Sequence, residues 1–278
     1  MSFLLPKSQE RPAQRPQRRV EPASILAVGS GKGGVGKTFM SITLASAFAQ
    51  AGKRTLLVDG DLGLANVDVQ LGIAPKTDLA AVIAGWVELE DAVTPVDGGS
   101  GSGGFDVLPG RSGSGALAEM SSEEVARLAA GLSALALQYD QVILDLGAGI
   151  ESNCMRLARA ADKVVMIITD EPTSMTDAYA FIKVLKGYAP NVEQVIAINQ
   201  CETRAAGQRT YEAVSRACQT FLGFRPHLAG TIMRDEAVRE AIRSQRTLIS
   251  TDPSSQPIQD AIAIAHTLLG RTGQEMHY

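Results

Sequence analysis

Short apolar runs alternate with longer amphipathic stretches along most of the chain. The runs lie at 25–29, 54–59, 105–109, 141–145, 163–169, 195–199 and 228–232. Continuous apolar runs of this length are typical of strands buried on both faces, as in parallel sheets. Strand and helix patterns in alternation indicate an α/β fold. The pattern therefore predicts a mostly parallel central sheet, flanked by helices in three layers.

The stretches between the runs have helical character. We expect helices at 39–51, about 77–86, 121 to about 139, 172 to about 187, 205–222, about 235–245 and about 257–269. Gly52 follows the first helix, at the position where helices commonly end with a residue in the left-handed conformation. Ser121 and Glu124 have the spacing of a capping box. Residues 97–104 contain only Gly, Ser and one Asp, which predicts a flexible loop that is either a moving element or an inert insertion.

The length fits one large domain or two small ones, and the composition predicts an aliphatic core. The chain has 278 residues, of which 45% are hydrophobic and only 5% aromatic. We expect a domain at 23–270, a leader at 1–22 and a polar tail at 271–278. The leader is rich in Pro and Arg, which is typical of a segment without a packed core. It is interpreted either as a docking tail or as an inert leader.

Net charge and cysteine content limit the binding partners and the cellular compartment that the sequence is compatible with. A net charge of −4 argues against nucleic-acid binding by the whole surface. Arg239 and Arg243 each follow a Glu by three residues, so we expect a largely self-paired face there. Three widely spaced cysteines match no metal or disulfide pattern and favour the reducing cytoplasm. No window approaches the roughly 18 apolar residues of a membrane span.

A glycine-rich motif follows the first apolar run. It reads Gly31, Lys32, Gly33, Gly34, Val35, Gly36, Lys37, Thr38, and it fits the phosphate-loop pattern between a strand and a helix. Backbone N–H groups of such a loop, and the following helix N-terminus, bind phosphate. Lys37 can reach the β- and γ-phosphates and Thr38 can ligate Mg²⁺. Lys32 is a second lysine within this loop, and phosphate binding by the loop does not require it.

Polar residues end several of the predicted strands. Asp59 ends the run at 54–59 and Asp61 lies two residues further on, Asp145 ends the run at 141–145, and Asn199 ends a later run. Ligands of open α/β sheets bind at the carboxyl ends of strands. The order of these carboxylates after the phosphate loop predicts a Mg²⁺ site and a hydrolysis site at this edge. The loop after Asp145 is glycine-rich and able to register a γ-phosphate.

The phosphate loop resembles the deviant Walker A loop of the MinD/ParA ATPases, which carry an extra lysine where Lys32 stands. Within that family the chain most resembles the flagellar-number regulators FlhG and FleN. The matching stretches include Asp-Leu-Gly-Leu-Ala-Asn-Val-Asp at 61–68 and Asp-Glu-Pro-Thr-Ser at 170–174, with further matches at 145–150 and 234–239. The resemblance covers roughly residues 24–269 and implies the P-loop NTPase fold.

The resemblance implies a role for each matching residue. Lys37 and the loop amides hold the phosphates, and Lys32 reaches the phosphates of a partner in a nucleotide-sandwich dimer. Thr38 binds Mg²⁺, helped through water by Asp59 and Asp145, and Asp61 positions the attacking water. Asn199 contacts adenine, and backbone near Met233 and Arg234 closes the base pocket. The implied ligands are ATP and Mg²⁺.

The implied function is an ATP-hydrolysing switch that dimerises on ATP and regulates flagellar number, placement or gene expression. Expected partners are a second copy of the chain and a flagellar GTPase or transcription regulator. An alternative is a ParA-type segregation or positioning ATPase bound to the nucleoid, although DNA binding is not favoured. A third interpretation is a non-catalytic anti-activator gated by ATP.

Some positions depart from the family pattern. Phe39 stands where many relatives have a second Thr, and Leu146 replaces a small or hydroxyl residue after the Walker B carboxylate. A membrane-targeting C-terminal helix and a leader motif of the Asp-Gln-Ala type are not evident. We therefore expect a cytoplasmic protein, for which a partner is the conceivable route to the membrane or cell pole.

Overall fold

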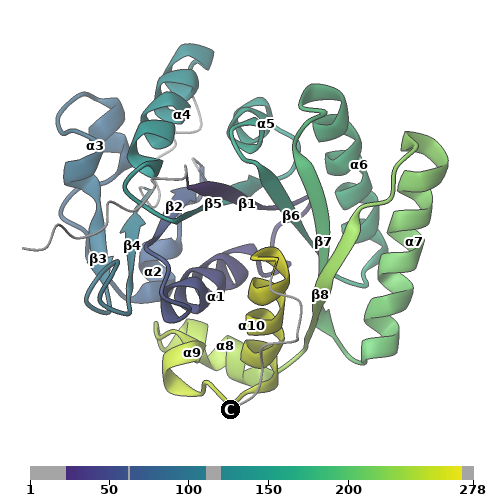
Figure 1. Ribbon diagram of the computed structural model, residues 1–278. Coiled ribbons are helices and arrows are strands. Elements are labelled where there is room, and N and C mark those ends of the chain that lie inside the picture. The colour runs from purple at the N-terminus through teal and green to yellow at the C-terminus, as the bar shows by residue number, and fades with distance from the viewer. Residues whose placement is uncertain (1–22, 62, 111–119, 271–278) are drawn as a thin grey trace, which may run out of the picture.

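A central sheet of eight strands organises the chain (Figure 1). The computed structural model describes residues 23–61, 63–110 and 120–270. The strands are β1 (Ser24–Ser30), β2 (Thr55–Gly60), β3 (Thr94–Val96), β4 (Phe105–Leu108), β5 (Gln141–Ala148), β6 (Lys163–Ile168), β7 (Glu193–Cys201) and β8 (His227–Met233). Their order is β3-β4-β2-β5-β1-β6-β7-β8. All neighbouring pairs are parallel except β3 and β4, so the predicted mostly parallel sheet is confirmed.

Helices cover both faces of the sheet and complete three layers (Figure 1). One face carries α4 (Ser122–Ala136), α5 (Ser152–Arg159), α6 (Pro172–Tyr188) and α7 (Arg204–Leu222). The other carries α1 (Lys37–Gln50), with α2 (Val67–Leu71), α9 (Leu248–Thr251) and α10 (Gln256–Leu268) packed against it. α8 (Glu236–Arg243) packs against α9, and α3 (Leu79–Ile83) packs against the 3-10 turn η1 (Glu90–Ala92).

The core has two aliphatic halves, one on each face of the sheet. Successive residues of β1 alternate between them: Ile25 and Ala27 belong to the half under α4 to α7, and Leu26 and Val28 to the half under α1 and α10. This alternation follows from the period of two along a strand. It explains why the strands are apolar throughout, as the sequence predicted.

Local signals in the sequence also match the structure. The Ser121 hydroxyl and the Glu124 carboxylate form the predicted capping box. Gly52 adopts a left-handed φ of 78° directly after α1, and the N–H groups of Gly52 and Lys53 bond back to Ala49 and Phe48. All three cysteines are buried as free thiols, as small apolar residues would be.

Four short elements were missed: α2, β3, α5 and α9. β3 has only three residues and contains Pro95, and α5 has only eight. Residues 1–22 and 271–278 lie outside the described residues, so the predicted division into leader, domain and tail stays a prediction. Within the described ranges, no helix combines the length and apolar character that crossing a membrane requires.

Candidate nucleotide-binding site

The glycine-rich loop connects β1 to α1 at the carboxyl edge of the sheet. Gly34 and Gly36 have φ values of 80° and 92°, a region that L side chains rarely adopt. Gly31 lies against the backbone of α6, so that a Cβ there would overlap the Asp177 carbonyl. At Gly33 and Gly34 a Cβ would meet nothing within 4 Å. The loop is therefore fixed at one end and has an open central part.

Lys37 and Thr38 form the first turn of α1 and are both buried. The Lys37 charge and a hydrogen bond from the Thr38 side chain both act on the Asp145 carboxylate. Ser41, one turn later, donates to Asp145 Oδ1 at 2.8 Å. The first turn of α1 is thereby joined to Asp145 of β5, with the helix N-terminus directed at the loop.

Asp59 and Asp145 are neighbours across β2 and β5 in the register of the sheet. Both are buried. Burial, followed by the charge of Asp145, raises the pKa of Asp59 to about 7. Burial is also the main cause that raises the pKa of Asp145 to about 6, against the opposing Lys37 charge. Two adjacent buried carboxylates beside a threonine hydroxyl are a donor set that fits Mg²⁺, which would neutralise their charge.

Mg²⁺ usually binds one or two protein carboxylates together with substrate phosphates, not a full protein cage. Among the described residues, no group of three or more His, Cys, Asp or Glu side chains is placed to hold an ion by itself. The assignments of Thr38, Asp59 and Asp145 as Mg²⁺ ligands stay predictions.

Asp59 also has a structural role that the sequence did not indicate. Its Oδ2 accepts the backbone N–H groups of Asn66 at 2.9 Å and Val67 at 3.0 Å. Its Oδ1 accepts the N–H of Asp61 at 3.3 Å. One carboxylate thus holds both ends of the segment between β2 and α2, so its position is coupled to the segment that carries Asp61.

Asp61 directly follows β2 and faces the C-terminal residues of β5. Its Oδ1 accepts the backbone N–H of Leu64 at 3.0 Å and lies 3.4 Å from where a Cβ on Gly147 would be. Gly147 was expected in a loop that starts after Asp145, but β5 continues to Ala148, so that expectation was wrong for residues 146–148. The structure brings Asp61 and Gly147 together, while the water-positioning role of Asp61 stays a prediction.

A cavity of about 260 Å³ lies beside the loop and includes Phe39, Asn199, Gln200, Met233 and Arg234 in its lining. Asn199, Met233 and Arg234 were expected around the base. Phe39 and Gln200 were not expected there. Phe39, one of the departures from the family pattern, is buried and also packs against α9 and α10. The predicted base pocket therefore has a matching cavity.

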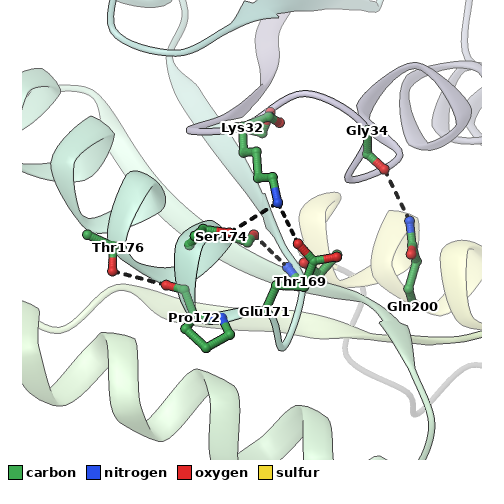
Figure 2. A network of polar contacts seen from close by, with 10 residues as sticks. Lys32, Gly34, Thr169, Glu171, Pro172, Ser174, Thr176 and Gln200 are labelled. Carbon is green, nitrogen blue, oxygen red and sulfur yellow. Dashed lines mark hydrogen bonds and ion pairs between the residues drawn. The ribbon is translucent and has the colours of Figure 1, made fainter.

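Asn199 is tied to the phosphate loop. Its Nδ2 donates to the Val35 carbonyl at 2.8 Å, and its Oδ1 accepts the Gln200 N–H at 2.8 Å. Gln200 has a positive φ of 58° and donates from Nε2 to the Gly34 carbonyl at 3.3 Å (Figure 2). The end of β7 thus supports the loop from the base side. Contact between Asn199 and adenine stays a prediction.

Two hydrogen bonds fix the other wall of the base cavity. The Met233 N–H donates to the buried Asp260 carboxylate at 2.9 Å, and the Arg234 N–H donates to the Cys201 carbonyl at 2.9 Å. Asp260 also pairs with Arg204. The backbone near Met233 and Arg234 is therefore held in place at the site where it was expected to close the pocket.

Lys32 extends away from the phosphate cradle toward the start of α6 (Figure 2). Its Nζ lies 2.5 Å from Glu171 Oε2 and 3.1 Å from Thr173 Oγ1. The hydrogen bond and charge of Lys32 lower the pKa of Glu171. In the single chain, the residue expected to reach a partner's phosphates is thus paired within its own chain.

Sequence reasoning missed the contacts of Ser41, Glu171 and Gln200. Ser41 had a usable signal, since it lies three residues after Thr38 and thus on the same side of the helix. Glu171 lies shortly after a predicted strand end, where ligand-binding residues gather. Gln200 directly follows Asn199. Its positive φ and its hydrogen bond to the Gly34 carbonyl are not visible in the sequence.

The fold and the site define a phosphate-loop nucleotide-binding domain. Residues 26–248 match the sequence profile described as the CobQ/CobB/MinD/ParA nucleotide binding domain, and the chain belongs to this family. The resemblance to MinD/ParA ATPases is thereby confirmed.

Two curated relatives are flagellar proteins. The antiactivator FleN of Pseudomonas aeruginosa is 37% identical over 85% of this chain and 83% of its own. The flagellum site-determining protein YlxH of Helicobacter pylori is 29% identical over 89% of this chain and 82% of its own. The similarity to flagellar regulators within the family is thus confirmed.

Solved structures give the same fold. MinD of Pyrococcus horikoshii OT3, complexed with Mg-ADP, superposes with a TM-score of 0.74 at 24% identity and covers 88% of this chain and 96% of its own. MinD in the MinC:MinD complex of Aquifex aeolicus gives a TM-score of 0.76 at 23% identity, covering 92% of this chain and 100% of its own. At this identity the likeness establishes the P-loop NTPase fold.

Proposed function

We propose that this chain is an ATP-hydrolysing switch that dimerises on ATP and regulates flagellar number, placement or gene expression. The observation that carries the proposal is the position of the Lys32 side chain. It lies on the rim of a phosphate loop, its side chain is 39% exposed, and it points away from the cradle that Lys37 serves. A cation so placed is available to the phosphates of a second chain, which would make an interface depend on bound nucleotide.

The remaining residues supply the parts of a hydrolysis site. The loop N–H groups, the α1 N-terminus and Lys37 would bind the β- and γ-phosphates. Thr38, with Asp59 and Asp145, would hold Mg²⁺, whose charge offsets that of the phosphates. Asp61 would orient a water toward the γ-phosphate from beside Gly147 of β5. Positioning and charge stabilisation of this kind are sufficient for phosphoryl transfer to water.

The switch would work by exchange of partners at Lys32. In the structure, Lys32 pairs with Glu171 and Thr173 of its own chain. With ATP bound, the negative phosphates of a facing chain offer a stronger partner, and the dimer is favoured. Loss of the γ-phosphate would weaken that attraction and return Lys32 to α6. ATP shifts the population because it interacts differently with the two states.

The flagellar assignment rests on the similarity to FleN and YlxH. FleN is described as an antiactivator and YlxH as a flagellum site-determining protein. We therefore place the partner of this chain among flagellar regulators, either a transcription activator or a flagellar GTPase. The alternative, a nucleoid-bound ParA-type ATPase, needs a basic surface. Arg239, one of the cations on α8, is 3.0 Å from Glu236, so part of the positive charge of this helix is paired within it.

The test measures phosphate release and particle mass for the wild type and for Asp61→Ala. If Asp61 orients the water, the variant should bind ATP and remain dimeric while phosphate release falls at least about tenfold. Asp91→Ala, an exposed carboxylate on η1, serves as the control. Normal phosphate release by Asp61→Ala would refute the hydrolytic role. ATP-dependent, salt-sensitive binding to arbitrary DNA would favour the ParA-type alternative.

A further inference from the structure

A groove of about 430 Å³ lies between α3 and α4, on the opposite side of α4 from α5 in Figure 1. Its lining includes the apolar side chains of Val82, Ile83, Val87 and Leu128 and the carboxylates of Glu88 and Glu124. None of the described residues of the groove belongs to the nucleotide site. The proposed ATP switch therefore leaves this surface without a role.

Trp86 stands at the edge of this groove, between Gly85 and Val87, which both line it. Its backbone is fixed, because the Trp86 N–H donates to the Ala81 carbonyl and the Gly85 N–H donates to the Val82 carbonyl in a Schellman cap of α3. Its side chain is nevertheless 76% exposed. A large aromatic side chain held in solvent by a rigid turn beside an apolar groove marks an interaction surface.

The surroundings of the groove are acidic. Glu88 and Glu124 line it, and the exposed Glu90, Asp91 and Glu123 lie next to them in the chain. Glu124 stays ionised, because hydrogen bonds from Ser121 lower its pKa. The lining also contains the cation Arg127, and it lies 3.6 Å from Glu123. The charge that an occupant would meet is therefore net negative.

One segment of this chain has the complementary composition. The leader, residues 1–22, begins with adjacent apolar residues, Phe3, Leu4 and Leu5. They are followed by five cations, Lys7, Arg11, Arg15, Arg18 and Arg19, against two acids, Glu10 and Glu21. We propose that the leader docks in the groove between α3 and α4 of its own chain, with Phe3, Leu4 and Leu5 beside Trp86 and its cations facing the acidic rim.

The leader is long enough to reach the groove. It joins the domain at Ser24, which pairs with Gln141 at the start of β5. Residues 137–140 connect Gln141 to the C-terminal end of α4. Leu128, which lines the groove, lies closer to the N-terminus of that helix. At ~1.5 Å per helical residue and at most ~3.5 Å per turn residue, the path from Gln141 to Leu128 is roughly 30 Å or less. An extended leader spans roughly 65–75 Å.

Trp86 is the only tryptophan of the chain, so its fluorescence reports on the groove alone. The experiment compares the full chain with a variant lacking residues 2–20. Docking predicts a blue-shifted emission and weaker acrylamide quenching in the full chain, both lost on deletion. A synthetic peptide of residues 1–20, which contains neither Trp nor Tyr, should restore both in a saturable manner. Added salt should weaken that binding.

Two charge variants show whether the acidic rim of the groove is responsible for docking of the leader. Glu88→Lys combined with Glu90→Lys should remove the emission shift of the full chain. Glu240→Lys, on the exposed side of α8, should leave it unchanged. Cooperative thermal unfolding of both the full and the shortened chain establishes that both are folded, so that a lost shift reports docking.

Three results would overturn the proposal. Identical Trp86 emission in the full and shortened chains means that the leader does not cover the groove. An emission shift that grows with protein concentration means that a second copy is the occupant. Peptide binding that persists in the Glu88→Lys, Glu90→Lys variant means that the acidic rim does not select the leader. The proposal is independent of ATP switching, because its readout needs no nucleotide.

Discussion

Lys32 Nζ lies 2.5 Å from Glu171 Oε2, although the two residues are 139 positions apart in the sequence. Thr173 accepts a second hydrogen bond from the same ammonium group. The start of α6 therefore holds the lysine that, in our account, must cross to a second chain. The intrachain contacts and the dimer contact compete for one side chain, because Lys32 cannot make both.

Weakening the intrachain pair should favour the dimer. The Glu171→Gln, Thr173→Ala variant leaves Lys32 without its carboxylate and hydroxyl partners, so dimerisation should occur at a few-fold lower ATP or protein concentration. The effect is modest because exposed ion pairs are weak. Sedimentation velocity across an ATP titration measures it. Glu193→Gln, which breaks the surface pair with Lys163, is the control, and a dimer unchanged or weakened in the α6 variant would contradict competition.

The close packing of Gly31 against α6 should contribute to the free energy of unfolding. A methyl group at Gly31 would overlap the backbone of Asp177 and Ala178, whereas one at Gly33 would meet nothing within 4 Å. We expect Gly31→Ala to lower the free energy of unfolding by roughly 1–3 kcal/mol. Gly33→Ala should change it by less than about 0.5 kcal/mol. Urea unfolding of the nucleotide-free protein measures both, and equal stabilities would show that α6 adjusts freely.

Asp59 should make the nucleotide-free protein less stable as pH rises. Its pKa rises from an ordinary 3.8 to about 7 on folding. Between those values the folded chain keeps a proton that the unfolded chain has released, so the free energy of unfolding falls with increasing pH. Urea unfolding between about pH 5 and 8 measures this slope for the wild type and for Asp59→Asn. The variant should be flatter, and an equal or steeper slope would exclude Asp59 as the cause.

The edge of the sheet that carries the site was predictable from sequence, because several of the apolar runs end in a polar residue. Asp59 lies next to the end of β2, whereas β5 and β7 continue past Asp145 and Asn199 to Ala148 and Cys201. The glycine spacing likewise located the phosphate loop. These features depend only on neighbours in the chain and on the rule that parallel strands end together.

Contacts between distant segments were not predictable. The Lys32–Glu171 pair depends on how closely α6 packs on the loop, which in turn requires glycine at position 31. The hydrogen bonds of Asp59 to Asn66 and Val67 depend on the path of a segment with no regular pattern. α5 was missed because it is one of the short elements and Arg156 interrupts its apolar residues.

The central claim, that Lys32 makes dimerisation depend on ATP, is tested most directly by light scattering in an Asp61→Ala background, where slow hydrolysis preserves any dimer. With Mg²⁺ and ATP, Asp61→Ala should double its mass, and so should Asp61→Ala, Lys183→Ala, in which an exposed lysine of α6 is removed. Asp61→Ala, Lys32→Ala should stay monomeric at the same ATP occupancy. A dimer of equal stability in that last variant would contradict the account.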